Sequence, residues 1–174
     1  LDYEKKLTLP QAFLLTALSW LSIAIFGSLP FVFSDLSLSF TNAFFESMSG
    51  ITTTGSTILT NLNETPKAIL LWRAMLQWLG GIGIIVMAIT LMPIMNIGGM
   101  QLFVISNTHT PEKILPKSKE ISIRLIAIYS SLTLVCAFFY KIFGMSFFDS
   151  IVHSMTTIAT VSYTHLRAHE TEAD

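Results

Sequence analysis

The chain contains one polar loop whose residues could bind an ion, within the stretch MSGITTTGSTILTNLN from Met48 to Asn63. Three threonines, Thr52–Thr54, run directly into Gly55. β-branched residues favour an extended backbone, and glycine permits positive φ without placing a side chain in the way. Carbonyl oxygens lined up along such a segment can replace the hydration shell of a monovalent cation. The loop has no carboxylate, which argues against a divalent-ion site; the alternative interpretation is a Thr/Gly turn that ends a buried helix.

The composition indicates that this loop lies in a membrane protein. Of the 174 residues, 52% are hydrophobic and only 12% are charged, whereas soluble domains carry about 25% charged residues. The formal net charge of −1 gives no reason to expect a nucleic-acid partner. The single cysteine, Cys136, lies in an apolar run and is interpreted as a small core hydrophobe.

Three segments are long enough to cross a bilayer, for which about 20 apolar residues are needed. They are Gln11–Phe33, Ala68–Met95 and Ile121–Phe143. The second contains Arg73 and the pair Gly80–Gly81, which we interpret as flexible. Arg73 is expected a turn or two from the outer end of its span, where it either reaches toward the interface or forms a buried ion pair.

Two further apolar segments, Ser39–Ile51 and Ser146–Thr160, are too short to cross the membrane. Each is either a re-entrant helix buried in protein or a helix lying flat at the interface. Their first residues predict helix N-caps, Ser146 with Asp149 and, more weakly, Ser39 with Asn42.

The two short segments also match each other residue by residue at one constant offset. The matching residues are Ser39, Phe40, Ser47, Met48, Ile51 and Thr53 with Ser146, Phe147, Ser154, Met155, Ile158 and Thr160. Each copy follows a long span, so the sequence predicts a repeated unit of span, short helix, polar loop and span. Internal repeats are a common way to build a transport site on a pseudo-symmetry axis.

Loop charges predict the orientation of these units. Lysines precede the first span and follow the second, and they are Lys5, Lys6, Lys113, Lys117 and Lys119. Only Lys67 lies between the first two spans. The positive-inside rule therefore places the N-terminus in the cytoplasm and the Thr-Gly loop outside.

Two other classes of protein remain as alternatives. An intramembrane hydrolase would need a catalytic set, for which the candidates are Glu46, Ser47, Ser49 and His153, but no hydrolase motif surrounds them. His153 is interpreted as a structural polar contact. A non-conducting scaffold subunit would explain the spans but not a repeated Thr-Gly loop.

The segments FFESMSGITTTGST, WRAMLQWLGGIGIIVMAITLMP and GGMQLF resemble the potassium-uptake proteins of the Trk/Ktr/HKT superfamily, and most of all its bacterial TrkH branch. The resemblance implies an all-α integral membrane fold in which span–pore-helix–filter-loop–span units surround a pore, as in a potassium-channel subunit. It implies that the protein transports potassium and is not an enzyme. By the same resemblance, potassium is bound at the selectivity-filter residues Thr53, Thr54, Gly55 and Thr160, with Thr52 and Ser56 supporting the filter.

The resemblance further implies a multi-pass protein of the bacterial inner membrane, in contact with lipid and homodimeric when full length. Its partner would be a cytoplasmic nucleotide-binding regulatory subunit of TrkA type, and no cofactor beyond the transported potassium is expected. The chain would then be a fragment of about one and a half of the family's four repeats.

We therefore divide the chain into one complete and one partial repeat. The expected parts are a first repeat at 1–100 (span 11–33, pore helix 39–51, filter loop 52–57, span 68–95), a connector at 101–120, and a second repeat at 121–160 (span 121–143, pore helix 146–159). After Thr160 the family pattern of two glycines and an aromatic residue is replaced by Val161, Ser162 and a polar tail. We interpret residues 161–174 as non-native sequence. His165, His169 and Glu170 lie in this tail, and for that reason we do not interpret them as a metal site.

Overall fold

The computed structural model describes residues 9–60, 64–95 and 114–159, and this part of the chain is helical with connecting loops. Its helices are α1 (Leu9–Val32), α2 (Phe40–Ile51), α3 (Lys67–Met95), α5 (Ile114–Ile142) and α6 (Phe147–Ile158). Thr160 and the tail 161–174, with the expectations attached to them, lie outside the described residues.

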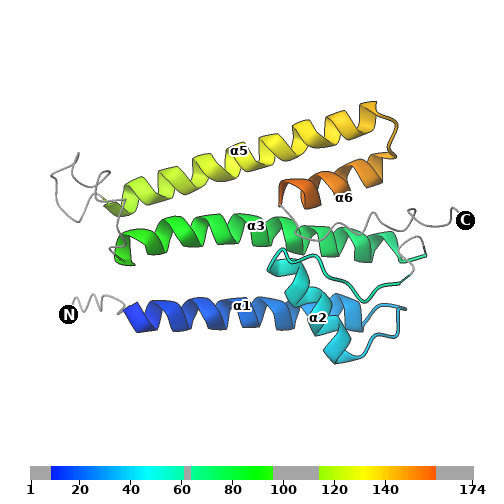
Figure 1. Ribbon diagram of the computed structural model, residues 1–174, viewed down its shortest axis with the longest axis horizontal. Coiled ribbons are helices and arrows are strands. Elements are labelled where there is room, and N and C mark those ends of the chain that lie inside the picture. The colour runs from blue at the N-terminus through cyan, green and yellow to red at the C-terminus, as the bar shows by residue number, and fades with distance from the viewer. Residues whose placement is uncertain (1–8, 61–63, 96–113, 160–174) are drawn as a thin grey trace, which may run out of the picture.

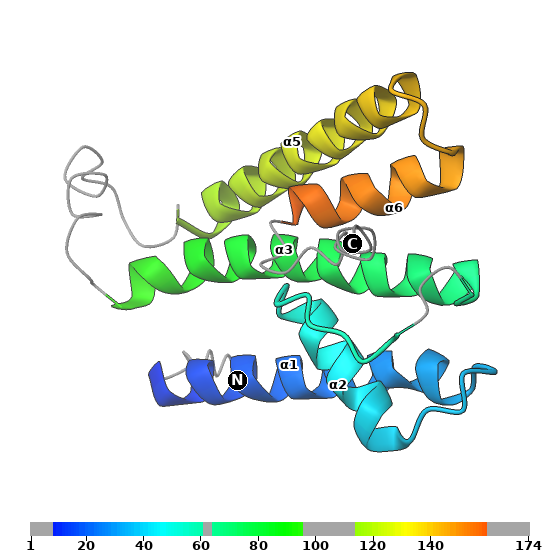
Figure 2. The ribbon, with the colours of Figure 1, turned by 45° about the vertical axis from the view of Figure 1, so that its right-hand side comes forward.

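Three long helices lie side by side, with α3 between α1 and α5 and antiparallel to both (Figures 1 and 2). The two short helices start at the same end of the molecule and run back toward its middle. Helix α2 packs between α1 and α3, and α6 packs between α3 and α5. Helix α3 is therefore the element that both short helices share.

The long helices have the length and composition of membrane spans. The qualifying segments are Phe13–Val32, Lys67–Met87 and Ile121–Ile142, with mean hydropathy of 1.8, 1.7 and 1.9. Their outer faces are apolar: Phe26 and Leu134, for example, are 70% and 72% exposed. Without a bilayer such faces would contact water, which indicates a membrane protein. The three helices with the character of membrane spans overlap the three segments expected from the sequence.

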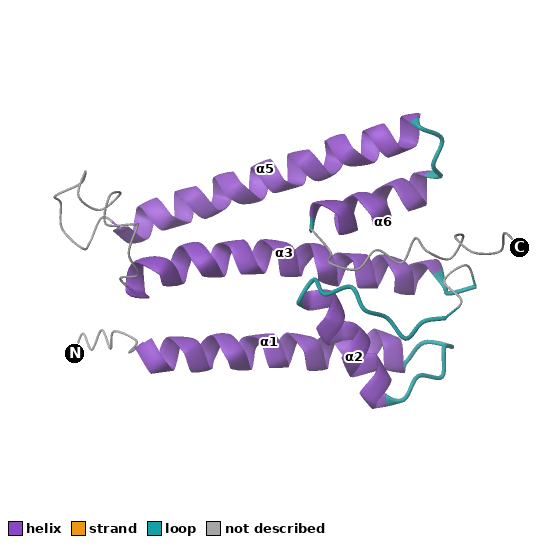
Figure 3. Cartoon of the chain, in the orientation of Figure 1, coloured by secondary structure: helices purple, strands orange, loops and turns teal. Residues whose placement is uncertain are grey.

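Figure 3 shows where the long helices begin and end, and three of these helix ends lie near a proline in the sequence. Helix α1 ends at Val32, two residues after Pro30. Helix α3 begins directly after Pro66, whose carbonyl accepts bonds from the amides of the third and fourth residues that follow it, at 2.9 and 3.2 Å. Helix α5 begins at Ile114, so the last residues of the expected connector are helical. Pro116 falls in its first turn, where a missing N–H has no intrahelical partner to lose.

The junction of α1, α2 and α3 has an apolar core, made by Phe31, Ala43, Ile69 and Leu76. The indole nitrogen of Trp72, at its edge, donates a hydrogen bond of 2.9 Å to the carbonyl of Gly27 on α1. This cluster lies toward the end of the bundle where α2 starts, and it fixes α2 against both neighbouring spans.

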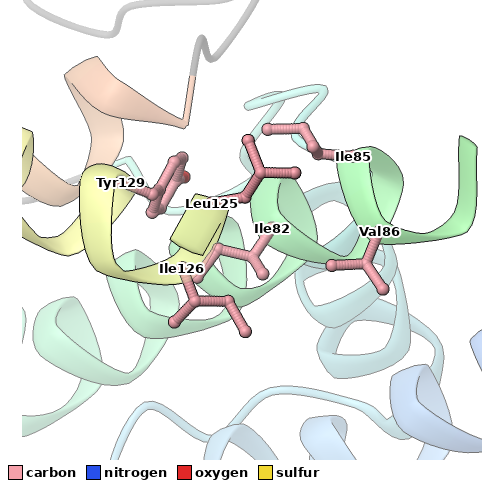
Figure 4. A pocket seen from close by; sticks show the side chains of 6 residues that line it. All are labelled: Ile82, Ile85, Val86, Leu125, Ile126 and Tyr129. Carbon is pink, nitrogen blue, oxygen red and sulfur yellow. The ribbon is translucent and has the colours of Figure 1, made fainter. Parts of the chain in front are cut away.

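The contact between α3 and α5 is made by hydrogen-bonded aromatic residues instead. The Trp78 indole donates to Thr133 Oγ1 at 3.0 Å, and the Tyr129 hydroxyl donates to the Trp78 carbonyl at 3.2 Å. A small apolar cavity lies beside Tyr129 (Figure 4). Its lining is Ile82, Ile85, Val86, Leu125, Ile126 and Tyr129. The side chains that line this cavity carry no charge.

Candidate functional site

Helix α2 starts where the sequence predicts an N-cap. Ser39 has extended backbone angles (φ −64°, ψ 155°), and its hydroxyl accepts a hydrogen bond from the amide of Asn42 at 3.3 Å. This side chain satisfies one of the free amides of the first turn, so the helix can begin at Phe40. The last two turns are buried between the spans, at Glu46, Ser47, Ser49, Gly50 and Ile51.

The loop after α2 folds back onto the last turn of the helix. The amides of Thr52, Thr53 and Gly55 donate to the carbonyls of Met48, Gly50 and Ser49, at 3.0, 2.9 and 3.3 Å. These bonds satisfy carbonyls that would otherwise end the helix without partners.

This folding corrects the expectation of a continuously extended threonine run. Thr53 has φ of 57° and Gly55 has φ of 83°, both in the left-handed region. A β-branched residue is rare there, and the three bonds from the loop to the end of α2 compensate for the strain. Glycine adopts the same region without strain, so the expectation that Gly55 supplies positive φ is confirmed.

Hydroxyl groups brace both sides of the loop. Thr52 Oγ1 donates to the Met48 carbonyl at 2.8 Å and lies 2.9 Å from Thr54 Oγ1. Ser49 Oγ donates to the carbonyl of Ser56 at 2.6 Å. The loop is therefore tied to α2 by side chains as well as by its backbone.

The strongest support of the loop is an ion pair between Arg73 of α3 and Glu46 of α2. Arg73 Nε lies 2.9 Å from Glu46 Oε2, and the glutamate is fully buried while the arginine side chain is 13% exposed. Arg73 Nη2 also donates to the carbonyls of Gly55 and Ser56, at 2.8 and 3.2 Å. Of the two environments expected for Arg73, the structure therefore has the buried ion pair.

Glu46 binds the loop with its other carboxylate oxygen. Oε1 accepts hydrogen bonds from the hydroxyl of Thr57 and, at 2.5 Å, from the amide of Ile58. Arg73 and Glu46 together hold both Gly55–Ser56 and the return of the chain toward α3. Since a buried charge left without its partner costs about 3–5 kcal/mol, this arrangement is held rigidly.

The carbonyls of the loop are not equivalent. Those of Thr53 and Thr54 accept no hydrogen bond from the residues that the structure describes, whereas the carbonyl of Gly55 accepts one from Arg73. A carbonyl oxygen with both lone pairs free can coordinate a cation. The two threonine carbonyls are thus available, and that of Gly55 is shared with a guanidinium group.

The C-terminal ends of both short helices pack against one glycine pair of α3, Gly80 and Gly81. A Cβ on Gly80 would lie 1.9 Å from the carbonyl oxygen of Ile51, the last residue of α2. A Cβ on Gly81 would lie 3.2 Å from Cα of Ala159, directly after α6. The pair lies inside a continuous helix, so its role is close packing and not the flexibility that the sequence suggested.

Helix α6 begins in the same way as α2. The Ser146 hydroxyl accepts from the amide of Asp149 at 3.1 Å and donates to the Asp149 carboxylate at 2.6 Å. Near the other end of the helix, the hydroxyls of Thr157 and Tyr140 lie 2.9 Å apart. Both expected N-caps are therefore confirmed.

The residues considered for a hydrolase are not brought together. Helices α2 and α6 do not contact each other within the described part of the chain, so His153 is separated from the α2 residues. Glu46 is bound to Arg73, and Ser49 donates to the loop. Among the described residues there is also no group of three or more His, Cys, Asp and Glu side chains that could hold a metal.

Sequence reasoning missed two parts of this site. A buried ion pair was one of two alternatives for Arg73, but Glu46 was not named as its partner, although a carboxylate in one short helix and an arginine in the next span could have indicated the pair. Gln77, which is buried on α3, drew no attention because one amide in an apolar span gives little signal.

The fold and the site define a multi-span membrane protein in which a short, partly buried helix presents a braced polar loop between two spans. The family profile of the TrkH cation transport proteins matches residues 2–165. The chain therefore belongs to the TrkH family.

Its relatives include two potassium-uptake proteins that share nearly half of the aligned residues. The chain is 47% identical over 150 residues to the Trk system potassium uptake protein TrkI of Halomonas elongata, covering 86% of this chain and 30% of that protein. It is 45% identical over 152 residues to TrkH of Escherichia coli K12, covering 86% and 32%. The chain thus spans about a third of the length of these relatives.

A solved structure agrees with the fold. The crystal structure of the potassium transporter TrkH from Vibrio parahaemolyticus superimposes with a TM-score of 0.78 at 41% identity. The match covers 94% of this chain and 32% of that one.

Proposed function

We propose that the chain is part of a potassium-uptake subunit and contributes one complete and one partial repeat to its pore. Helices α2 and α6 act as pore helices, and the loop after α2 forms the first part of the selectivity filter. Potassium is the transported ion, no other cofactor is required, and the ion moves passively through a path lined by carbonyl oxygens.

The observation that carries this proposal is the braced loop with free threonine carbonyls. Thr53 and Thr54 leave their carbonyls unbonded by the described residues, while Thr52 and Ser56 are held by side-chain hydrogen bonds. A filter must keep its carbonyls at fixed spacing so that dehydrated ions of one size are favoured. We assign Gly55 to the filter as well, with its carbonyl shared with Arg73.

Thr160 is proposed as the corresponding filter residue of the second unit, on sequence grounds. It follows Ala159, which packs against the same glycine pair as the end of α2. Two short helices that end on one span fit the geometry of neighbouring pore units.

The remaining features are proposed from charge and family. The N-terminus and the Lys-rich connector lie in the cytoplasm, and the protein resides in the bacterial inner membrane. The full-length subunit forms a homodimer and binds a nucleotide-binding regulatory subunit of TrkA type at its cytoplasmic side.

The test is ion selectivity in the full-length protein that carries this sequence. Gly55→Ser places a Cβ at φ of 83°, which strains the loop by about 1–2 kcal/mol and displaces the neighbouring carbonyls. We expect the preference for potassium over sodium to fall several-fold in cells or vesicles. Unchanged selectivity would show that this loop is not the filter.

A second experiment distinguishes a transport function from a catalytic one. Ser47→Ala and His153→Ala remove two hydrolase candidates whose side chains make no hydrogen bond to the loop among the described residues. Cation flux should persist in both variants. Flux lost in either of them, with the protein still folded, would argue against the proposed path.

A further inference from the structure

Helices α3 and α5 are joined by a closed ring of three hydrogen bonds among Trp78, Thr133 and Tyr129, which we call the aromatic clasp. The Trp78 indole donates to Thr133 Oγ1 at 3.0 Å, and this hydroxyl donates to the carbonyl of Tyr129 at 2.8 Å. The Tyr129 hydroxyl donates in turn to the carbonyl of Trp78 at 3.2 Å. Thr133 and Tyr129 are each only 8% exposed, so water does not compete for these bonds. The clasp therefore holds the Tyr129 hydroxyl in one place.

The Tyr129 hydroxyl packs against the same glycine as the end of α6. A Cβ on Gly81 would lie 2.6 Å from this hydroxyl and 3.2 Å from Cα of Ala159. Ala159 directly follows α6 and is buried. Gly81 thus has no room for a methyl group on this side, because the tyrosine hydroxyl and the end of α6 already occupy the space around it.

The buried serines of α6 use their hydroxyl groups within the helix itself. Ser150 and Ser154 are each 1% exposed, and they donate to carbonyls four and three residues earlier in the chain, at 2.7 and 2.8 Å. Thr157, in the last turn, instead has its hydroxyl 2.9 Å from the hydroxyl of Tyr140 on α5. Helix α5 therefore supplies tyrosine side chains at two points near the C-terminal end of α6.

We propose that Tyr129, held by the aromatic clasp, is a positioning residue for the C-terminal end of α6. This inference rests on the proposed function, in which α6 is a pore helix and its end must stay at a fixed distance from the ion path. Helix α6 packs between α3 and α5, so the spacing of these two spans determines the space available to it. The clasp fixes this spacing with neutral groups, whereas the loop after α2 is held by the ion pair of Arg73 and Glu46.

The first test changes Thr133 in the full-length protein. Thr133→Val removes the hydroxyl at nearly constant volume and breaks two of the three bonds of the clasp. We expect the preference for potassium over sodium, measured in vesicles, to fall several-fold, because Tyr129 no longer holds the end of α6. Thr133→Ser keeps the hydroxyl and should retain the wild-type selectivity.

Ser131→Ala is the matched control on the same helix. Its hydroxyl donates to the carbonyl of Ile128 in α5 at 2.8 Å, and the residue is exposed. Loss of this hydroxyl should change neither the selectivity nor the midpoint of thermal unfolding. A Thr133→Val protein with wild-type selectivity would overturn the proposal even if its unfolding midpoint were lowered, because the clasp would then only stabilise the fold.

Tyr129→Phe covers the case in which Thr133→Val does not accumulate. It removes the bond to the Trp78 carbonyl and the hydroxyl beside Gly81, and it leaves the other two bonds of the clasp in place. A several-fold loss of selectivity is expected here too, and wild-type selectivity would overturn the proposal.

The same measurements separate this inference from the proposed function. A wild-type protein with no preference for potassium would refute the proposed function. The unfolding midpoints would then decide the role of the clasp, because Thr133→Val should lower the midpoint more than Ser131→Ala does. Equal midpoints for these two variants would show that the clasp does not hold α5 against α3.

Discussion

The two short helices begin alike and are held differently. Ser39 and Ser146 cap α2 and α6 with nearly the same backbone angles, and both helices have 12 residues. In α2, the fully buried Glu46 binds Arg73 of the following span. The corresponding residue of α6 is His153, which is half-buried and makes no side-chain hydrogen bond to the described residues.

The difference shows which features of a short helix and its loop depend only on residues close by in the sequence. A cap needs only residues within one turn, so each short helix carries its own start signal. The support of the loop needs a charged pair from two elements that are 27 positions apart in the chain. Helix position is therefore encoded within the short segment, while loop rigidity depends on the span that follows it.

The largest effect is expected when the ion pair is broken. Arg73→Met leaves Glu46 buried without a cation and removes the bonds to Gly55 and Ser56, which should destabilise the full-length protein by about 3–5 kcal/mol. His153→Ala, the matched change on the other side of the comparison, should cost far less. Thermal unfolding of the purified proteins measures both.

A double variant distinguishes the pair from a general packing defect. Glu46→Gln removes the buried negative charge, so Arg73→Met should cost less in the Glu46→Gln background than in wild type. Equal costs in the two backgrounds, or an Arg73→Met variant as stable as His153→Ala, would contradict the assigned role of the ion pair.

The glycine pair Gly80–Gly81 allows the same comparison at the C-terminal ends of α2 and α6. A Cβ on Gly80 meets the backbone of Ile51 at 1.9 Å, whereas a Cβ on Gly81 first meets the Tyr129 hydroxyl at 2.6 Å. A side-chain hydroxyl can move and a helix backbone cannot. Gly80→Ala should therefore destabilise by at least about 1–3 kcal/mol, and Gly81→Ala by less.

Tyr129→Phe is the control for this pair. It removes the hydroxyl that a Cβ on Gly81 would meet, so Gly81→Ala should be better tolerated in the Tyr129→Phe background. Gly80→Ala should not be relieved. Unfolding midpoints that rank Gly81→Ala below Gly80→Ala would contradict the closer packing of α2 against this glycine pair.

The sequence predicted what depends on short-range patterns. Apolar length located the three spans, and serine followed three residues later by a polar residue located both caps. It also identified Gly55 as a position for positive φ. Each of these features depends on a few adjacent residues and on the solvent around them, so one sequence is enough to find it.

The errors concern contacts between distant elements. Thr53 was expected to be extended, but the bonds from the loop to the end of α2 outweigh the local preference of a β-branched residue. The pair Gly80–Gly81 was read as flexible, although its role is to let two other helices approach. Neither outcome can be derived without knowing what packs against the residue.

The smallest expected effect concerns the caps, where the two helices are most alike. Loss of a serine N-cap costs about 0.5–2 kcal/mol, so Ser39→Ala and Ser146→Ala should both lower the unfolding midpoint slightly. Ser146 should cost more, because it also donates to the Asp149 carboxylate at 2.6 Å, whereas Asn42 offers no charge at the equivalent place. In an Asp149→Asn background this excess should vanish, since the cap serine and the residue three positions after it are then the same in both helix starts. An excess that survives that substitution would mean that the caps differ through their surroundings and that the similarity of the two helix starts is only geometric.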